Sequence, residues 1–160
     1  MALTSDKRIM AVGRSNNSIE IWDTETFSQL LVIPGHKNVD IRNIIWIEKD
    51  LVKEGKQKQL VNPFYHRVIK NGKVIEKKRR LVTTSLNGLV VEWDLLTGGF
   101  KSKTALGGGA IWCSRFDGKF GYLACEDGAI RVIKVKKKRI ELVKQLSKAD
   151  SGCLSIDIVK

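Results

Sequence analysis

The residues best suited to acid–base or nucleophilic chemistry are few in this sequence, and their spacing matches no known catalytic arrangement. His36, Asp94 and the cysteines are candidates, yet the sequence contains no G-x-S-x-G elbow, H-E-x-x-H motif or P-loop. The glycine-rich stretch 107–109 lacks the Lys-Ser/Thr pair of a phosphate-binding loop, so a structural bend is the simpler interpretation. We therefore expect no enzymatic activity and no cofactor.

The three cysteines, Cys113, Cys125 and Cys153, have a spacing that fits neither a CxxC zinc pair nor a disulfide framework. His36 and His66 are the histidines that could assist them. We expect structural thiols in a reducing compartment and no bound metal. No apolar stretch approaches the ~20 residues that span a bilayer, and the first residues lack a signal-peptide pattern. The sequence thus favours an intracellular protein without membrane contact.

The net charge of +12 is concentrated in two segments. Residues 48–80 carry eleven Lys or Arg against four Asp or Glu, and residues 131–148 carry eight against one. Each segment contains a run of four basic residues: Lys77, Lys78, Arg79 and Arg80 in the first, and Lys136, Lys137, Lys138 and Arg139 in the second. These runs fit solvated loops, a phosphate-contacting RNA surface or a nuclear import signal. Aromatic residues are scarce near them, so we expect no base-specific recognition.

A tight turn followed by a short strand is repeated along the chain. The repeat occupies residues 15–23, 86–94 and 126–134. Its turns contain Asn16-Asn17, Asn87-Gly88 and Asp127-Gly128. These pairs tolerate positive φ and predict two-residue type I′ hairpins. Trp93 and the aligned Ile133 are about one blade of ~40–45 residues apart, which is typical of a WD40-type β-propeller.

The repeats predict an all-β domain over residues 1–160 that forms a partial WD40-type propeller of about three and a half four-stranded blades. The first blade would use residues 9–14, 19–23 and 30–33 and lack its innermost strand. The second would use residues 41–47, 81–85, 89–94 and a weak strand near Phe100. The third would use residues 110–116, 120–125, 129–135 and 140–146, and residues 152–159 would begin a fourth.

A Lys-rich insertion at about 48–80 separates the first two repeats, and within it residues 67–76 predict a further hairpin around Asn71-Gly72. Closed propellers have typically four to eight blades, so the predicted blades are too few for a ring. We expect a longer chain or a partner to supply the missing blades. Unpaired sheet edges should make the isolated chain prone to aggregation.

The tryptophan of a WD40 repeat anchors a hydrogen-bond chain through its blade, together with a histidine, a hydroxyl residue and a turn aspartate. The second repeat offers candidates for all four positions: His36, Thr83, Asn87 and Trp93. Asn87 stands where aspartate is usual, which would make the chain neutral. In the third repeat, Leu123 and Ile133 replace the hydroxyl residue and the tryptophan. We expect Trp93 to be buried between adjacent blades.

A set of motifs falls in the order found in the first blades of cirhin-like WD40 proteins. The motifs are residues 11–15 leading into 19–22, 34–36, 86–88, 92–95, 108–112 and 125–128. Cirhin-like proteins are tandem propellers of the t-UTP subcomplex of the small-subunit processome. The resemblance implies a nucleolar scaffold for early pre-ribosomal RNA transcription and processing, with processome proteins as partners and pre-rRNA or snoRNA as ligands of the basic loops. The alternative is a general WD40 protein–protein adaptor unrelated to ribosomes.

Overall fold

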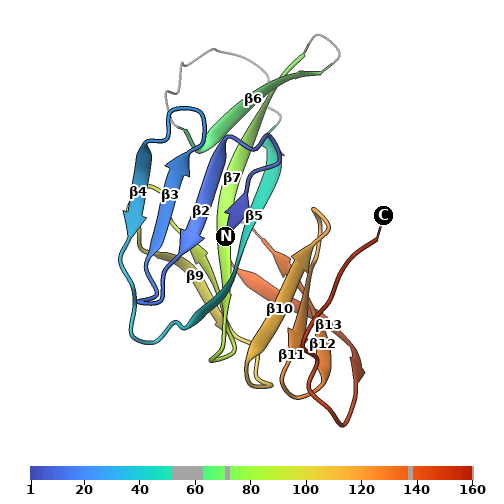
Figure 1. Ribbon diagram of the computed structural model, residues 1–160. Helices are drawn as coiled ribbons and strands as arrows, with labels where there is room; N and C mark the ends of the chain where they lie inside the picture. The colour runs from blue at the N-terminus through green and yellow to red at the C-terminus, as the bar shows by residue number, and fades with distance from the viewer. Residues whose placement is uncertain (52–62, 71–72, 137–138, 160) are drawn as a thin grey trace.

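A computed structural model of the chain describes residues 1–51, 63–70, 73–136 and 139–159. Within these residues the strands form three antiparallel sheets that follow one another along the chain, without a helix (Figure 1). No helix in the described part is therefore long and apolar enough to cross a membrane. The prediction of an all-β fold forming part of a WD40-type propeller is confirmed.

Blade 1 is a four-stranded sheet at the beginning of the chain. Its strands are, from one edge to the other, β1 (Ala2–Leu3), β2 (Ile9–Gly13), β3 (Ile19–Asp23) and β4 (Gln29–Ile33). The prediction that this blade lacks its innermost strand is wrong, because Ala2 and Leu3 pair with Ala11 and Met10. A strand of two residues is too short to show the alternation of apolar and polar residues by which strands are found.

Blade 2 has two strands that continue far beyond the blade. Its strands are β5 (Ile41–Leu51), β7 (Lys73–Ser85), β8 (Leu89–Trp93) and β9 (Phe100–Ala105). The pairing of β5 with β7 runs from Ile41 opposite Ser85 to Leu51 opposite Glu76. A further strand, β6 (Tyr65–Lys70), pairs with the first half of β7, and the Asn71-Gly72 turn between them lies outside the described residues.

Blade 3 consists of four strands at nearly the predicted positions. They are β10 (Ile111–Phe116), β11 (Gly121–Cys125), β12 (Ala129–Val135) and β13 (Ile140–Lys148). Residues 152–159 form no strand among the described residues, so the fourth blade that they are predicted to begin stays a prediction. The Cys153 amide donates to the Cys125 carbonyl at 3.0 Å, and Asp157 pairs with Arg115 at 3.2 Å. These contacts attach the segment to blade 3.

The inner hairpin of each blade is closed by a four-residue β-turn that is not of the predicted type I′. In each turn the fourth amide donates to the first carbonyl: Asn17 to Arg14, Gly88 to Ser85 and Gly128 to Cys125. Positive φ falls on Asn17, Gly88 and Gly128, as predicted for the glycines. A type I′ turn has positive φ at both central residues, whereas each of these turns has it only at the fourth residue. A Cβ on Gly128 would also lie 2.2 Å from the Ala149 carbonyl oxygen.

Two apolar clusters join the three blades. One contains Ile21, Ile33, Leu81 and Trp93 and lies between blades 1 and 2. The other lies between blades 2 and 3 and includes Val82, Val90, Leu123 and Ile133. Successive side chains of a strand point to opposite faces, so β7 and β8 supply both clusters. Trp93 is 2% exposed, which confirms its predicted burial between adjacent blades.

Candidate functional site

Trp93 lies at the centre of a small aromatic cluster. Its indole N–H donates a hydrogen bond of 2.9 Å to the Thr83 hydroxyl, and both residues are buried. The ring centroids of His36 and Phe100 lie 5.8 and 5.0 Å from that of Trp93. The structure thus brings together three of the four residues of the predicted hydrogen-bond chain, with His36 joining by ring packing. This arrangement joins β7, β8 and β9 to the loop between β4 and β5.

Asn87 belongs to a separate group at the turn between β7 and β8. Its side-chain oxygen accepts from the Ser85 hydroxyl at 2.6 Å, and its amide donates to the Asn38 carbonyl at 2.7 Å. The Ser85 hydroxyl in turn accepts from the Leu89 amide. Ser85 was not among the predicted residues, although serine and asparagine side chains commonly form hydrogen bonds within turns.

The corresponding turn of blade 3 is held by an ion pair. The Arg131 guanidinium donates to both carboxylate oxygens of Asp127, at 2.8 and 2.6 Å. These hydrogen bonds, against a smaller effect of burial, lower the pKa of Asp127 to about 2. A Cβ on Gly108 would lie 2.4 Å from an Arg131 nitrogen. The glycine-rich stretch therefore makes room for Arg131, in agreement with its interpretation as a structural bend.

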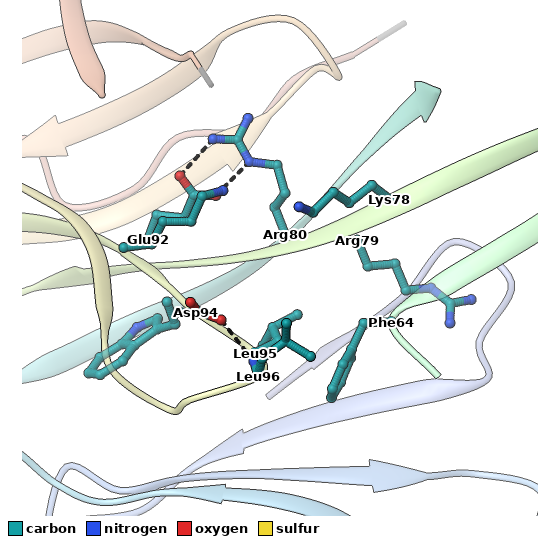
Figure 2. Close-up of a pocket in the computed structure, with 10 residues that line it drawn as sticks. Phe64, Lys78, Arg79, Arg80, Glu92, Asp94, Leu95 and Leu96 are labelled. Carbon is teal, nitrogen blue, oxygen red and sulfur yellow. Dashed lines mark hydrogen bonds and ion pairs between the residues drawn. The ribbon is translucent and has the colours of Figure 1, made fainter. Parts of the chain in front are cut away.

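The first basic run lies in β7, where alternation sends neighbouring side chains to opposite sides of the sheet (Figure 2). Arg80 forms two parallel hydrogen bonds of 2.6 Å with Glu92 in β8. Its guanidinium also donates to the carbonyls of Val135 and Lys136, at 3.0 and 2.7 Å. Arg80 therefore links blade 2 to the end of β12 in blade 3.

Glu92 is 1% exposed and receives hydrogen bonds from Arg80 and Lys101. Burial by itself raises the pKa of Glu92, but the hydrogen bonds and charges of these two cations outweigh it and leave the pKa below its ordinary value. The carboxylate is therefore ionised at neutral pH. Glu92 is therefore unsuited to general acid–base catalysis, which needs a pKa near the working pH.

Arg79 links blade 2 to blade 1. Its guanidinium forms an ion pair with Asp6, in the turn between β1 and β2, and donates to the Pro63 carbonyl at 2.8 Å. Glu48 lies 3.9 Å from its Nε atom. Arg79 and Arg80 are 4% and 6% exposed, so the proposed phosphate contact by these two residues is corrected: both are held by carboxylates between blades. Lys78 is half-buried, and the side chain of Lys77 lies outside the described residues.

A small hollow of about 150 Å³ opens beside these residues (Figure 2). Phe64, Leu95 and Leu96 form an apolar wall, and Lys78 and Lys101 stand near the buried Glu92. Sites for small molecules usually enclose ~300–1,000 Å³. The hollow can accept one side chain of a partner but is small for a substrate.

The second basic run lies at the turn between β12 and β13. Lys136 pairs with Glu141 at 2.6 Å, and Arg139 pairs with the same carboxylate. Both side chains are largely exposed, whereas Lys137 and Lys138 lie outside the described residues. Because Arg80 binds the Lys136 carbonyl, the structure brings the two basic runs into contact.

The described residues contain no group of three or more side chains that could hold a metal ion. Cys125 is buried, and Cys113 and Cys153 are half-buried. Burial raises the pKa of the Cys125 thiol and thus disfavours a reactive thiolate.

No family model matches the chain. The curated relatives include the U3 small nucleolar RNA-associated protein 4 homolog of Homo sapiens, 21% identical over 159 residues that make up 98% of this chain and 19% of the relative. The protein of the same name from Mus musculus is 23% identical, with the same shares covered. The chain therefore spans about a fifth of the length of the curated relatives it matches. This similarity confirms the resemblance to cirhin-like WD40 proteins of the small-subunit processome.

Proposed function

We propose that the chain is a non-enzymatic WD40 scaffold that docks other proteins of the small-subunit processome in the nucleolus, during pre-ribosomal RNA transcription and processing. The observation that carries this proposal is a similarity to U3 small nucleolar RNA-associated proteins that extends over 98% of the chain. The three propeller-type sheets support it, since propellers present loops and edges to partners.

Protein docking rather than catalysis also agrees with the chemistry of the described residues. Glu92 and Arg80 are charged but bonded to one another and to backbone groups, and Arg79 pairs with Asp6, so these contacts hold blades together. Such groups fix the shape of a scaffold.

The propeller that we propose is larger than the three sheets of the described residues. The outer faces of blades 1 and 3 lack a neighbouring blade within these residues. We propose that further blades, from a longer chain or from a partner, close the ring.

Sedimentation of the tagged protein from cell extract tests the proposed function. We expect it to sediment with large particles that contain U3 small nucleolar RNA, and to localise to the nucleolus. As a control, nuclease treatment of the extract should move both the protein and the RNA to lighter fractions. A general WD40 adaptor, for example in ubiquitin ligation or signalling, would instead stay in light fractions without U3 RNA, and this result would overturn the proposal.

A further inference from the structure

An aromatic ring lies between two lysines at one end of blade 3. Phe120 is in the turn between β10 and β11, and the Nζ atoms of Lys119 and Lys134 lie 5.1 and 5.8 Å from its ring centroid. Lys134 is in β12. The pairing of Gly121 with Ile133 brings this part of β12 beside the residue that follows Phe120. This group was not predictable from the sequence, since Lys134 is distant from Phe120 along the chain. Phe120 and Lys134 are half-buried and Lys119 is exposed, so all three can be reached from solvent.

The turn that presents Phe120 is held in one conformation. One carboxylate oxygen of Asp117 accepts hydrogen bonds of 2.7 Å from the amides of Lys119 and Phe120. The other accepts from the Tyr122 hydroxyl at 3.1 Å. The ring is thus positioned before any ligand arrives, and less conformational entropy is lost on binding.

The neighbouring turn, between β12 and β13, lies at the same end of the sheet, and Arg80 fixes it through the Val135 and Lys136 carbonyls. Within this turn Glu141 already neutralises part of the charge of Lys136 and Arg139. Asp117 is engaged with backbone amides and Tyr122. Lys119 and Lys134 place two positive charges at the aromatic ring, against the one negative charge of Asp117 in the same turn.

We propose that Phe120, Lys119 and Lys134 form a contact site for single-stranded RNA. The two lysine side chains, which lie over the Phe120 ring in the free protein, turn outward to the adjoining phosphates and leave the ring for one base to stack on. Aromatic stacking accepts any base, and lysine binds phosphate as a point charge, so the contact is independent of sequence. A duplex keeps its bases stacked on one another and does not offer a free face. The choice of RNA over single-stranded DNA rests on the proposed function.

Fluorescence anisotropy of the full chain with a labelled oligouridine tests this inference. Phe120→Leu keeps the apolar bulk but removes the ring, and we expect at least about fivefold weaker binding with an unchanged dependence on salt. The double variant Lys119→Ala/Lys134→Ala should lower the salt slope by ~1.4, because each single-strand phosphate contact contributes ~0.7. An unchanged unfolding midpoint in urea shows that each variant is folded.

The matched control is Lys37→Ala/Lys103→Ala, which removes two exposed lysines elsewhere and leaves the same net charge as the first double variant. Lys103 also lies over an aromatic ring, that of Phe100, at 5.4 Å. We expect this control to bind like the unchanged protein. Equal binding by Phe120→Leu and the unchanged protein would overturn the inference. Competition by duplex RNA or oligoglutamate as strong as by oligouridine would also overturn it, because the site would then bind any polyanion.

The failure of this inference is distinguishable from failure of the proposed function. If the scaffold docks through protein contacts alone, the chain still sediments with U3-containing particles while Phe120→Leu binds oligouridine normally. If the chain binds oligouridine through Phe120 but does not sediment with these particles, the RNA site stands and the processome role fails.

Discussion

The two basic runs have similar sequences and touch one another, but their side chains have different surroundings. Arg79 and Arg80 lie within β7, are almost completely buried and are held by carboxylates of three different segments. Lys136 and Arg139 flank a turn, remain largely exposed and share one carboxylate. The difference arises because strand alternation drives neighbouring side chains into the two interfaces of a blade, whereas a turn leaves them in water. A run of basic residues therefore suggests nucleic-acid contact only where its backbone leaves the sheet.

The strongest test of this difference is the removal of Arg80. We expect Arg80→Ala to lower the free energy of unfolding by ~3–5 kcal/mol, because Glu92 would stay buried with Lys101 as its remaining cation. Urea unfolding followed by tryptophan fluorescence measures the loss. Arg139→Ala is the matched control and should leave the midpoint nearly unchanged. Equal losses in both variants would show that the two runs do not differ in this way.

A double variant distinguishes the contribution of the ion pair to stability from that of the hydrogen bonds between Arg80 and blade 3. Arg80→Met/Glu92→Leu replaces the buried pair by apolar side chains, an exchange that is often neutral. The carbonyls of Val135 and Lys136 would still lose their donor, which costs ~1–3 kcal/mol. We therefore expect partial recovery relative to Arg80→Ala, measured by the same urea titration. Complete recovery would mean that the hydrogen bonds to blade 3 contribute nothing.

Arg131 is an intermediate case, buried in its blade but paired with the partly exposed Asp127. The pKa of Asp127 is about 2 in the folded protein, below the ordinary value of 3.8, so its ionised form stabilises the fold above that ordinary value. This stabilisation is lost as the pH falls from about 4 through about 2. We expect Asp127→Asn to show a smaller loss of stability across this window, measured by thermal unfolding. Parallel curves for both proteins would contradict the assignment.

The smallest effect is expected from the second run. Lys136→Ala/Arg139→Ala should leave folding unchanged and lower the salt slope of RNA binding by no more than ~1.4, two contacts at ~0.7 each. Because Glu141 competes with phosphate for both side chains, a smaller change is the expected result. Anisotropy titrations with oligouridine at several salt concentrations measure it. A larger decrease in slope would mean that Glu141 does not screen this turn.

Local patterns predicted the hairpins and the buried tryptophan well. The turn residues Gly88 and Gly128 and the alternation in β8 and β12 are properties of short segments, so no distant partner was needed to find them. The strand Ala2–Leu3 was missed because two residues are too few to show an alternation of apolar and polar side chains, although it pairs with the next strand, β2. Residues 152–159 have the apolar alternation that is typical of a strand, but they form none because no strand of the described residues pairs with them.

The site was harder to predict than the fold. A basic segment looks the same in a sequence whether it forms a loop or a strand, so the burial of Arg79 and Arg80 was not predictable without Glu92 and Asp6 in place. The predicted chain of four residues was partly informative, because the Trp93–Thr83 hydrogen bond exists while Asn87 bonds to Ser85. Phe120 was missed because Lys134 reaches it only through strand pairing.

The long pairing of β5 with β7 has a consequence for the order in which the chain folds. In blade 1, Arg14 and Glu20 meet across a hairpin only six residues apart, whereas Asn43 and Thr84 meet across 41 residues. Loop closure over longer distances costs more entropy and slows folding. Blade 1 can therefore form early, while β5 must wait for β7. At a synthesis rate of ~5–20 residues per second, β5 would stay unpaired on the ribosome for a few seconds. During that interval blade 1 can cover Ile44 and Trp46, whereas Ile47 belongs to the cluster with blade 3 and depends on a chaperone for cover.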